Sequence, residues 1–236
     1  MNKGIFNGKT KTVTFSFDDG NVDDKSLIEI MNKYGLKGTF NLNSGLLTEN
    51  TPWNYKGLKQ VRHINYCEYD DLYEGHEIAG HSYTHPDLTK LNLKDIENQI
   101  KLDKKLLEFL FGCKIEGFAY PMGTFNEQVG EVLQKNGIKY GRTTKPTYNF
   151  ELPKQPIFWH PTCHFMDQKI EELAERFINI KDENAVFYIW GHSYELIEDK
   201  DFIRFENLCK FLSSREDVSY LTNIQVINAL QVGDKI

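Results

Sequence analysis

Short apolar runs alternate along this chain with longer segments in which apolar residues recur every three or four positions. The short runs are typical of buried β-strands, and the periodic segments are typical of amphipathic helices. Seven strands are predicted in this way, at residues 12–17, 38–42, 77–80, 117–120, 138–143, 185–190 and 218–221.

Residues that can begin or end a helix flank the periodic segments between these strands. The candidate N-terminal caps are Asp23, Asn92, Asn126 and Asp167, another helix is expected near Asp201, and Thr222 with Gln225 has the spacing of a capping box. Gly35, Gly112 and Gly137 can end the first three helices.

Strict alternation of strands and helices implies parallel strands joined by right-handed crossovers. We therefore predict an α/β fold in which residues 1–236 form a single domain. The number of units favours a distorted (β/α) barrel with six or seven parallel strands.

Two long stretches, 44–64 and 145–165, show no regular pattern and are rich in aromatic residues. The aromatic residues are Trp53 and Tyr55 in the first stretch and Tyr148, Phe150, Phe158 and Trp159 in the second. Because long loops of such folds often carry function, we expect both stretches to line the mouth of an active site.

Composition excludes several classes of protein. The chain has 236 residues, 40% of them hydrophobic, and a formal charge of −6, so it can bury a large core and is not expected to bind nucleic acid. No signal peptide is recognisable near Met1, and the apolar run 185–190 is far shorter than the roughly 20 residues that span a membrane. Four scattered cysteines are expected to stay reduced, and a cytoplasmic location without membrane contact is expected.

Polar residues with catalytic potential follow the predicted strands at their C-terminal ends. They are Asp18 and Asp19 after the first strand, His81 and His85 after the third, Pro121-Met122-Gly123 after the fourth and His192 after the sixth. In parallel α/β barrels the active site forms at this rim, so these residues are expected to lie together.

Two histidines and one carboxylate can hold a divalent metal ion and leave positions open for water and substrate. His81 and His85 are four residues apart, a spacing that places both rings on the same side of a helical turn. Asp18 and Asp19 point in different directions, so one can bind the metal while the other accepts a proton. Alternatively, the aspartates could form only a turn or a helix cap, and the histidines could simply be solvated near Pro86.

The other histidines carry weaker signals. His192 could protonate a leaving group, or could be hydrogen-bonded at a strand end without a catalytic role. His63 and His76 have no neighbouring candidate residues and are predicted to be structural. His160 and His164 could reach the site from the second irregular stretch.

These motifs resemble those of the polysaccharide deacetylases, carbohydrate esterase family four, over nearly the whole chain from Thr12 to about Leu230. Phe17-Asp18-Asp19-Gly20 is similar to the family's first motif, and His81-Ser82-Tyr83-Thr84-His85 is similar to the second. The Pro121-Met122-Gly123 segment matches part of the third motif. Trp190-Gly191-His192 stands where the family has Leu-x-His, and this variant resembles the subgroup named after the gellan-lyase-associated domain.

The resemblance implies a role for each residue. Asp19, His81 and His85 would bind a divalent metal, expected to be Zn²⁺, and Asp18 would be the base that activates a metal-bound water. The backbone N–H of Met122 would stabilise the oxyanion, and His192 would protonate the departing amine or alcohol.

Three departures from the family pattern affect the expected site. The third motif normally opens with an arginine that orients the base, but Ala119 stands there, and we hypothesise that Arg142 replaces it. The fourth motif, which supplies an aspartate partner for the acid histidine, is not recognisable, and Glu195 is a candidate replacement. Trp190 replaces a leucine of the pocket for the acetyl methyl group.

The leading functional hypothesis is therefore an enzyme that removes acetyl groups, N- or O-linked, from an acetylated saccharide by zinc-assisted hydrolysis. A second hypothesis is hydrolysis of a C–N bond in a small cyclic amide. A third is a non-catalytic carbohydrate-binding module that uses the aromatic loops, although binding alone would not need a base, a metal site and an acid.

Overall fold

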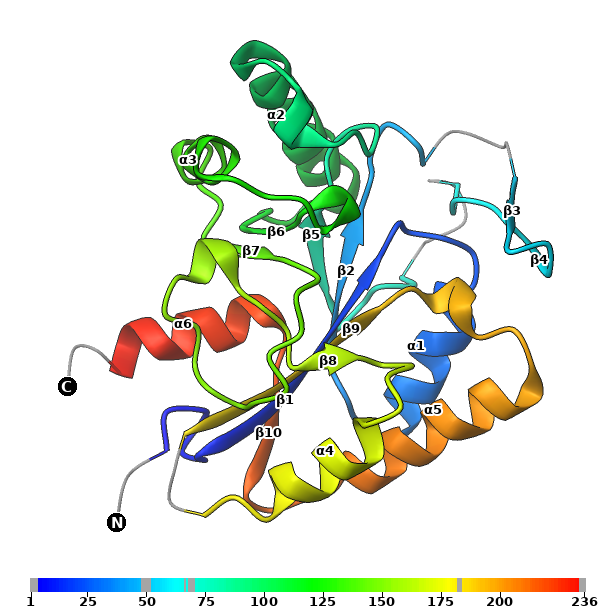
Figure 1. The fold of residues 1–236 in the computed structure, drawn as a ribbon, viewed down its shortest axis with the longest axis vertical. Coiled ribbons are helices and arrows are strands. Elements are labelled where there is room, and N and C mark those ends of the chain that lie inside the picture. Colours follow the sequence, from blue (N-terminus) through cyan, green and yellow to red (C-terminus); the bar gives the residue numbers. More distant parts are fainter. Residues whose placement is uncertain (1–3, 48–51, 66, 68–70, 182–183, 234–236) are drawn as a thin grey trace.

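A curled sheet of parallel strands forms the centre of the structure (Figure 1). The structure is a computed structural model that describes residues 4–47, 52–65, 67, 71–181 and 184–233. Seven strands follow one another in the order β7-β6-β5-β2-β1-β9-β8, and β10 also pairs with β1. The strands are β1 (Lys11–Asp18), β2 (Gly38–Leu42), β5 (Glu77–Gly80), β6 (Gly117–Ala119), β7 (Tyr140–Arg142), β8 (Cys163–His164), β9 (Ala185–Gly191) and β10 (Val218–Tyr220). The predicted α/β fold with a distorted barrel of parallel strands is confirmed, and the assignment of residues 1–236 to one domain remains a proposal.

Helices surround the sheet in separate groups (Figure 1). Helix α2 packs against α3, whereas α5 packs against both α1 and α4, and α6 packs against β1. The helices are α1 (Asp24–Lys33), α2 (Leu93–Phe111), α3 (Glu127–Lys135), α4 (Ile170–Ile178), α5 (Asp199–Leu212) and α6 (Asn223–Gly233). Among the residues described, no helix is both long and apolar enough to cross a membrane.

Two predicted caps are confirmed, and two differ from expectation. The side chains of Asn92 and Asn126 accept backbone hydrogen bonds at the starts of α2 and α3. Asp23 precedes α1 but forms no side-chain cap, and its carboxylate instead pairs with Lys59 at 2.9 Å. Helix α4 begins at Ile170 rather than at Asp167, because residues 167–169 form a turn in which the Asp167 carboxylate accepts the Lys169 N–H.

The first irregular stretch contains a hairpin that the sequence pattern does not indicate. Strands β3 (Trp53–Tyr55) and β4 (Lys59–Val61) pair antiparallel, and residues 48–51 of the stretch lie outside the described part.

The second irregular stretch contains β8 and joins the two ends of the sheet. The backbone N–H of Trp159 donates to Gly141 on β7, and the N–H of Thr162 donates to Tyr188 on β9, both at 2.8 Å. Residues 159–164 therefore bridge the gap that separates β7 from β9 and bring the sheet closer to a barrel.

The two faces of β1 carry different kinds of residue because successive side chains of a strand point to opposite sides. Val13, Phe15 and Phe17 enter the main hydrophobic core, where both phenylalanine rings contact Phe205 of α5. The opposite face bears Thr12, Thr14, Ser16 and Asp18, all buried. This polar row leads directly to the first motif and fixes the side on which the Asp18 carboxylate lies.

Candidate active site

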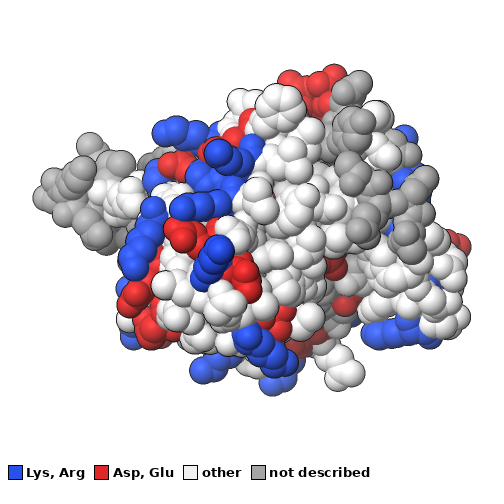
Figure 2. Space-filling view, turned by 90° about the horizontal axis from the view of Figure 1, so that it is seen from above, with Lys and Arg blue, Asp and Glu red and all other residues white. Residues whose placement is uncertain are grey.

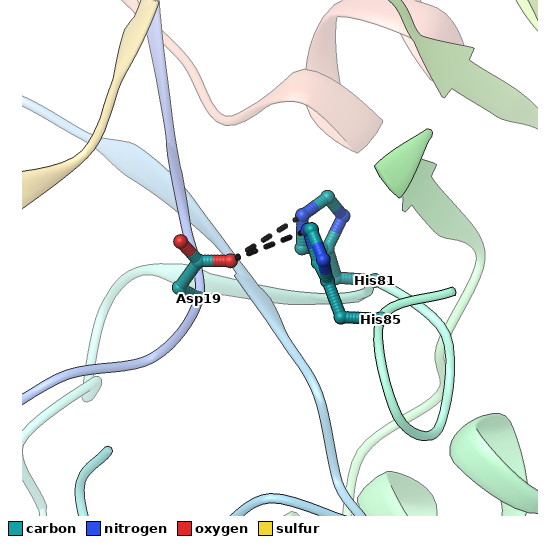
Figure 3. Close-up of side chains that lie close together, drawn as sticks. All are labelled: Asp19, His81 and His85. Carbon is teal, nitrogen blue, oxygen red and sulfur yellow. Dashed lines mark ion pairs between the residues drawn. The ribbon is translucent and has the colours of Figure 1, made fainter. Parts of the chain in front are cut away.

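Asp19, His81 and His85 meet at the C-terminal edge of the sheet, where β1 and β5 end (Figure 3). The Oδ1 atom of Asp19 lies 3.6 Å from Nε2 of His81 and 3.7 Å from Nε2 of His85. One ligand atom from each side chain lies within 4.8 Å of the other two. This arrangement is compact enough for one ion to contact all three side chains.

Hydrogen bonding prepares His81 to bind a metal ion. Its Nδ1–H donates to the carbonyl of Ala119 at 2.8 Å, so Nε2 is left unprotonated and faces Asp19. Burial lowers the pKa of His81 to about 4, which keeps the ring neutral as a metal ligand must be. Two imidazole nitrogens and one carboxylate oxygen therefore fit a divalent cation such as zinc.

An irregular turn, not a helix, brings the two histidines together. Residues 81–87 have no helical conformation, and both Ser82 (φ 68°) and His85 (φ 57°) adopt left-handed backbone angles. The Ser82 hydroxyl accepts the N–H of His85 at 3.1 Å, and the Asn43 amide donates to the carbonyls of His81 and Ser82. The expectation that both rings face one side is therefore confirmed, but the helical reason for it is wrong.

The carboxylate of Asp103, from α2, supports this turn from behind. It accepts hydrogen bonds from the N–H and hydroxyl of Ser44 at 2.8 and 2.7 Å and from the N–H of His81 at 3.0 Å. Burial raises the pKa of Asp103 to about 7. Neither Asp103 nor Asn43 could be identified from the sequence, because nothing in the pattern of a helix or a strand indicates which distant backbone groups such residues will contact.

The side chains of Arg142 and Asp18 form a buried ion pair. The guanidinium Nη2 contacts both carboxylate oxygens, and Asn41 donates to Oδ1 at 2.9 Å. Burial of Asp18 favours its neutral form, but the positive charge of Arg142, aided by the neighbouring histidines, outweighs this effect and lowers the pKa of Asp18. Asp18 is thus held ionised, the state in which it can accept a proton.

Two neighbours of Arg142, Ala119 and Trp190, define its position in the sheet and the packing of its guanidinium. It pairs in register with Ala119 on the adjacent strand β6, the position at which the resemblance places an arginine. The ring of Trp190 covers the guanidinium, whose Cζ lies 4.7 Å from the ring centroid. Trp190 therefore contacts the arginine by a cation–π interaction in this chain.

His192 follows β9 and faces both aspartates. Its Nε2 lies 3.9 Å from Oδ2 of Asp18 and 3.9 Å from Oδ2 of Asp19, and its ring stacks on Tyr194. The hydroxyl of Tyr194 donates to Oδ2 of Asp19 at 3.1 Å. Burial disfavours the charged ring of His192, but Glu195 and the two aspartates outweigh it and raise the pKa of His192 to about 9.

Met122 belongs to a 3-10 turn, Pro121–Gly123, that Tyr120 separates from the end of β6. Its backbone is left-handed (φ 57°), as is that of Asp19 (φ 76°). Left-handed residues other than glycine are uncommon and tend to gather at functional sites. The backbone N–H of Met122 remains the predicted oxyanion contact.

Aromatic residues of the first stretch lie at the site. Trp53 and Tyr55 of the β3–β4 hairpin contact the ring of Tyr194 with centroid distances of 5.7 and 4.9 Å. In the second stretch the expectation is wrong for Phe150 and Trp159, which are buried among aromatic neighbours elsewhere in the fold, whereas Phe158 is half-buried. Phe150 packs on Phe187, Phe158 on Tyr120 and Trp159 on Tyr188.

The remaining histidines fall into two groups. His63 lies beside the site, contrary to the prediction that it has no neighbouring candidate residues, since its Nδ1 lies 2.9 Å from the carbonyl oxygen of Asp19. His164 also lies beside the site and pairs with Glu195 at 2.8 Å. His160 is hydrogen-bonded to Thr143 instead. His76 accepts the N–H of Gly38 and faces Asn32, away from the site, as predicted for a structural residue.

Comparisons with known proteins identify relatives of this chain. An uncharacterized protein of Bacillus subtilis, YlxY, is 26% identical over 200 residues, which cover 78% of this chain and 56% of that protein. The chain thus spans just over half the length of this relative.

Solved structures share the fold. The family 4 carbohydrate esterase from Streptomyces lividans, in complex with acetate, aligns with a TM-score of 0.58 at 17% identity over 86% of this chain and 88% of its own. A family 4 pseudoenzyme from Bacillus anthracis aligns with a TM-score of 0.59 at 19% identity over 92% and 66%.

The family itself follows from the sequence match. The model of the polysaccharide deacetylase family matches residues 7–141, more than half of the chain. None of these matches tests the gellan-lyase-like subgroup, which stays a prediction. The extent of the family match shows that the chain belongs to the polysaccharide deacetylase family.

Proposed function

We propose that this chain hydrolyses acetyl groups, N- or O-linked, from an acetylated saccharide at a zinc centre. One observation carries the proposal. Nε2 of His192 lies 3.9 Å from Oδ2 of Asp18 and 3.9 Å from Oδ2 of Asp19, and Oδ1 of Asp19 faces the two histidine ligands. A base, a metal-ligand set and an acid thus converge on one point. Membership of the polysaccharide deacetylase family supports the substrate class.

Asp19, His81 and His85 would hold the metal ion. When bound, a divalent cation polarises a carbonyl group and lowers the pKa of water, the two effects that acetyl hydrolysis needs. The chain prepares the site through the turn that joins the two histidines and through the Ala119 carbonyl that fixes His81.

The other residues would handle protons and charge. Asp18, kept ionised by Arg142, would accept the proton of the attacking water, and His192 would give a proton to the departing amine or alcohol. The backbone N–H of Met122 would stabilise the negative charge that develops on the carbonyl oxygen.

The charge distribution suits a neutral substrate better than a polyanion. On the face shown in Figure 2, basic and acidic side chains are mixed along one side and the centre carries neither colour. The formal net charge of −6 likewise does not favour a polyanionic substrate.

The experiment measures acetate released from a panel of acetylated chito- and xylo-oligosaccharides. We would compare the protein stripped by a chelator, the protein reloaded with zinc, and the variants Asp18→Asn and Asp19→Asn. We expect turnover only with zinc and Asp18, and we expect zinc binding to survive Asp18→Asn but not Asp19→Asn.

The other outcomes identify the alternatives. Stoichiometric zinc without acetate release would favour hydrolysis of a cyclic amide, and this reaction can be assayed directly with small cyclic amides. The absence of both zinc binding and acetate release would contradict the proposed activity and leave a carbohydrate-binding module.

A further inference from the structure

A second group of potential metal ligands lies beside the first. His164, His192 and Glu195 each offer one ligand atom, and these atoms lie within 4.8 Å of one another. The three side chains could hold a second metal ion, or they could form a hydrogen-bonded chain that ends at the acid histidine. The protonation of His164 distinguishes these two arrangements.

A backbone donor fixes the protonation of His164. The N–H of Met166 donates to Nδ1 of His164 at 3.1 Å, so Nδ1 carries no proton and the neutral ring carries it on Nε2. That Nε2 lies 2.8 Å from Oε2 of Glu195, to which it donates. His81 has the opposite arrangement, because its Nδ1 faces a carbonyl and its Nε2 is free for a metal ion.

Glu195 connects His164 to the acid histidine. Its Oε2 atom accepts the Nε2–H of His164, accepts the backbone N–H of His192 at 3.1 Å and lies 3.5 Å from Nδ1 of the His192 ring. A carboxylate on the Nδ1 side favours a proton there and turns Nε2 towards Asp18 and Asp19. This orientation is the one that proton donation from Nε2 requires.

Gly191 makes the contact between these segments possible. His164 pairs in register with Trp190, and a Cβ atom at position 191 would lie 3.0 Å from Nε2 of His164 and 2.1 Å from the Phe165 ring. Any larger residue would clash with the Phe165 ring and crowd Nε2 of His164. The glycine between Trp190 and His192 thus serves the approach of His164 to Glu195.

We propose that His164 positions Glu195, and that Glu195 in turn positions His192 as the acid. This inference rests on the proposed function and assigns His164 and Glu195 as positioning residues rather than as ligands of a second metal ion. As the bond between the acetyl carbon and the leaving atom breaks, His192 would give its Nε2 proton to that atom and become neutral. Glu195 would stay ionised throughout.

The test compares two substrates that differ in their need for an acid. An acetylated oligosaccharide has a poor leaving group, whereas para-nitrophenyl acetate has a good one that departs without a proton. His164→Met removes the donor to Glu195, and His164→Gln keeps one, because the glutamine Nε2 can occupy nearly the same place. His160→Gln changes a histidine of the same segment that does not touch Glu195 and serves as the matched control.

We expect His164→Met to lower kcat on the oligosaccharide by about 10- to 100-fold, with KM and para-nitrophenyl acetate hydrolysis changed less than about threefold. His164→Gln should restore most of the lost activity, and His160→Gln should leave both reactions intact. Equal losses on both substrates, or failure of His164→Gln to restore activity that His164→Met lacks, would overturn the proposal.

Two readouts do not depend on turnover. The ring ¹⁵N shifts of His164 in the zinc-loaded protein, assigned by their absence from His164→Gln, should show a proton on Nε2 and none on Nδ1. Zinc binding should saturate at one ion per chain. A proton on Nδ1 would overturn the proposal, and a second zinc lost in His164→Gln would establish a metal ligand instead. If the wild type releases no acetate from any substrate, the proposed function fails, whereas these two readouts still decide the assignment of His164.

Discussion

The guanidinium of Arg142 contacts both carboxylate oxygens of Asp18, although the two residues are 124 positions apart in the chain. Both side chains are buried, at 0% and 3% exposure. Arg142 lies on β7 opposite Ala119 of β6, the position at which the resemblance places an arginine. The positive charge beside Asp18 therefore comes from the neighbouring strand. This geometry supports the hypothesis that Arg142 replaces the arginine of the third motif.

We expect Arg142→Ala to lower kcat for acetate release by about 100-fold, because Asp18 would lose the charge that keeps it ionised and oriented. Arg142→Lys should retain part of the activity, since an ammonium group can make only some of the contacts that the planar guanidinium makes. Steady-state kinetics on an acetylated oligosaccharide measures both changes.

Stability must be measured on the same variants, because removing one partner of a buried ion pair costs about 3–5 kcal/mol. Thermal unfolding followed by circular dichroism shows whether Arg142→Ala is folded at the assay temperature. A folded Arg142→Ala protein with unchanged kcat would show that Arg142 has no part in catalysis.

Zinc should stabilise the folded chain. A ligand that binds only the folded state at 100 times its Kd adds about 2.7 kcal/mol to the free energy of unfolding. We therefore expect a higher Tm with zinc for the wild type, no such rise for His85→Ala, and the full rise for His160→Gln. A zinc-induced shift that persists in His85→Ala would place the metal ion elsewhere.

Much of the site could be predicted because a parallel sheet puts the C-terminal ends of its strands on one edge. Asp18, Asp19, His81 and His192 each follow an apolar run, and the structure brings them together. The alternation of Thr, Ser and Phe along β1 also indicates which side chains face the core.

The other features of the fold and the site depend on contacts between distant segments, which no local sequence pattern encodes. The pairing of Arg142 with Ala119 follows from strand register, and β8 is only two residues long, too short for a periodicity. Asp103 lies on a buried helix position where an apolar residue would fit the pattern equally well. Its importance is visible only through the loops that it contacts.

Asp103→Asn should weaken zinc binding by about 10- to 100-fold, because the amide would turn its NH₂ group towards donors that now reach a carboxylate. The NH₂ group would replace one of the two carboxylate oxygens, so either Ser44 or His81 would lose its acceptor on this side chain, and the turn that orients the ligands would loosen. Calorimetric titration with zinc measures the affinity. Asp95→Asn, on the exposed first turn of the same helix, is the control, and equal affinities in the two variants would contradict the role of Asp103.

His76 lets the pH dependence of stability be tested away from the site. Its Nδ1 accepts the N–H of Gly38 at 3.1 Å, and its Nε2 faces Oδ1 of Asn32 at 3.0 Å, so the neutral ring satisfies both partners. Burial, with a smaller effect of Lys37, lowers the pKa of His76 from 6.5 to about 4. A proton on Nδ1 would break the bond to Gly38.

The unfolded chain binds this proton more readily than the folded chain, so the contribution of His76 is present above about pH 6.5 and is lost as the pH falls towards about 4. The loss amounts to at most about 3 kcal/mol. In His76→Asn the amide oxygen can still accept the Gly38 N–H and does not titrate. Urea unfolding at a series of pH values should therefore show wild-type stability falling more steeply than that of the variant over this range. Parallel curves for the two proteins would show that His76 titrates alike in the folded and unfolded states.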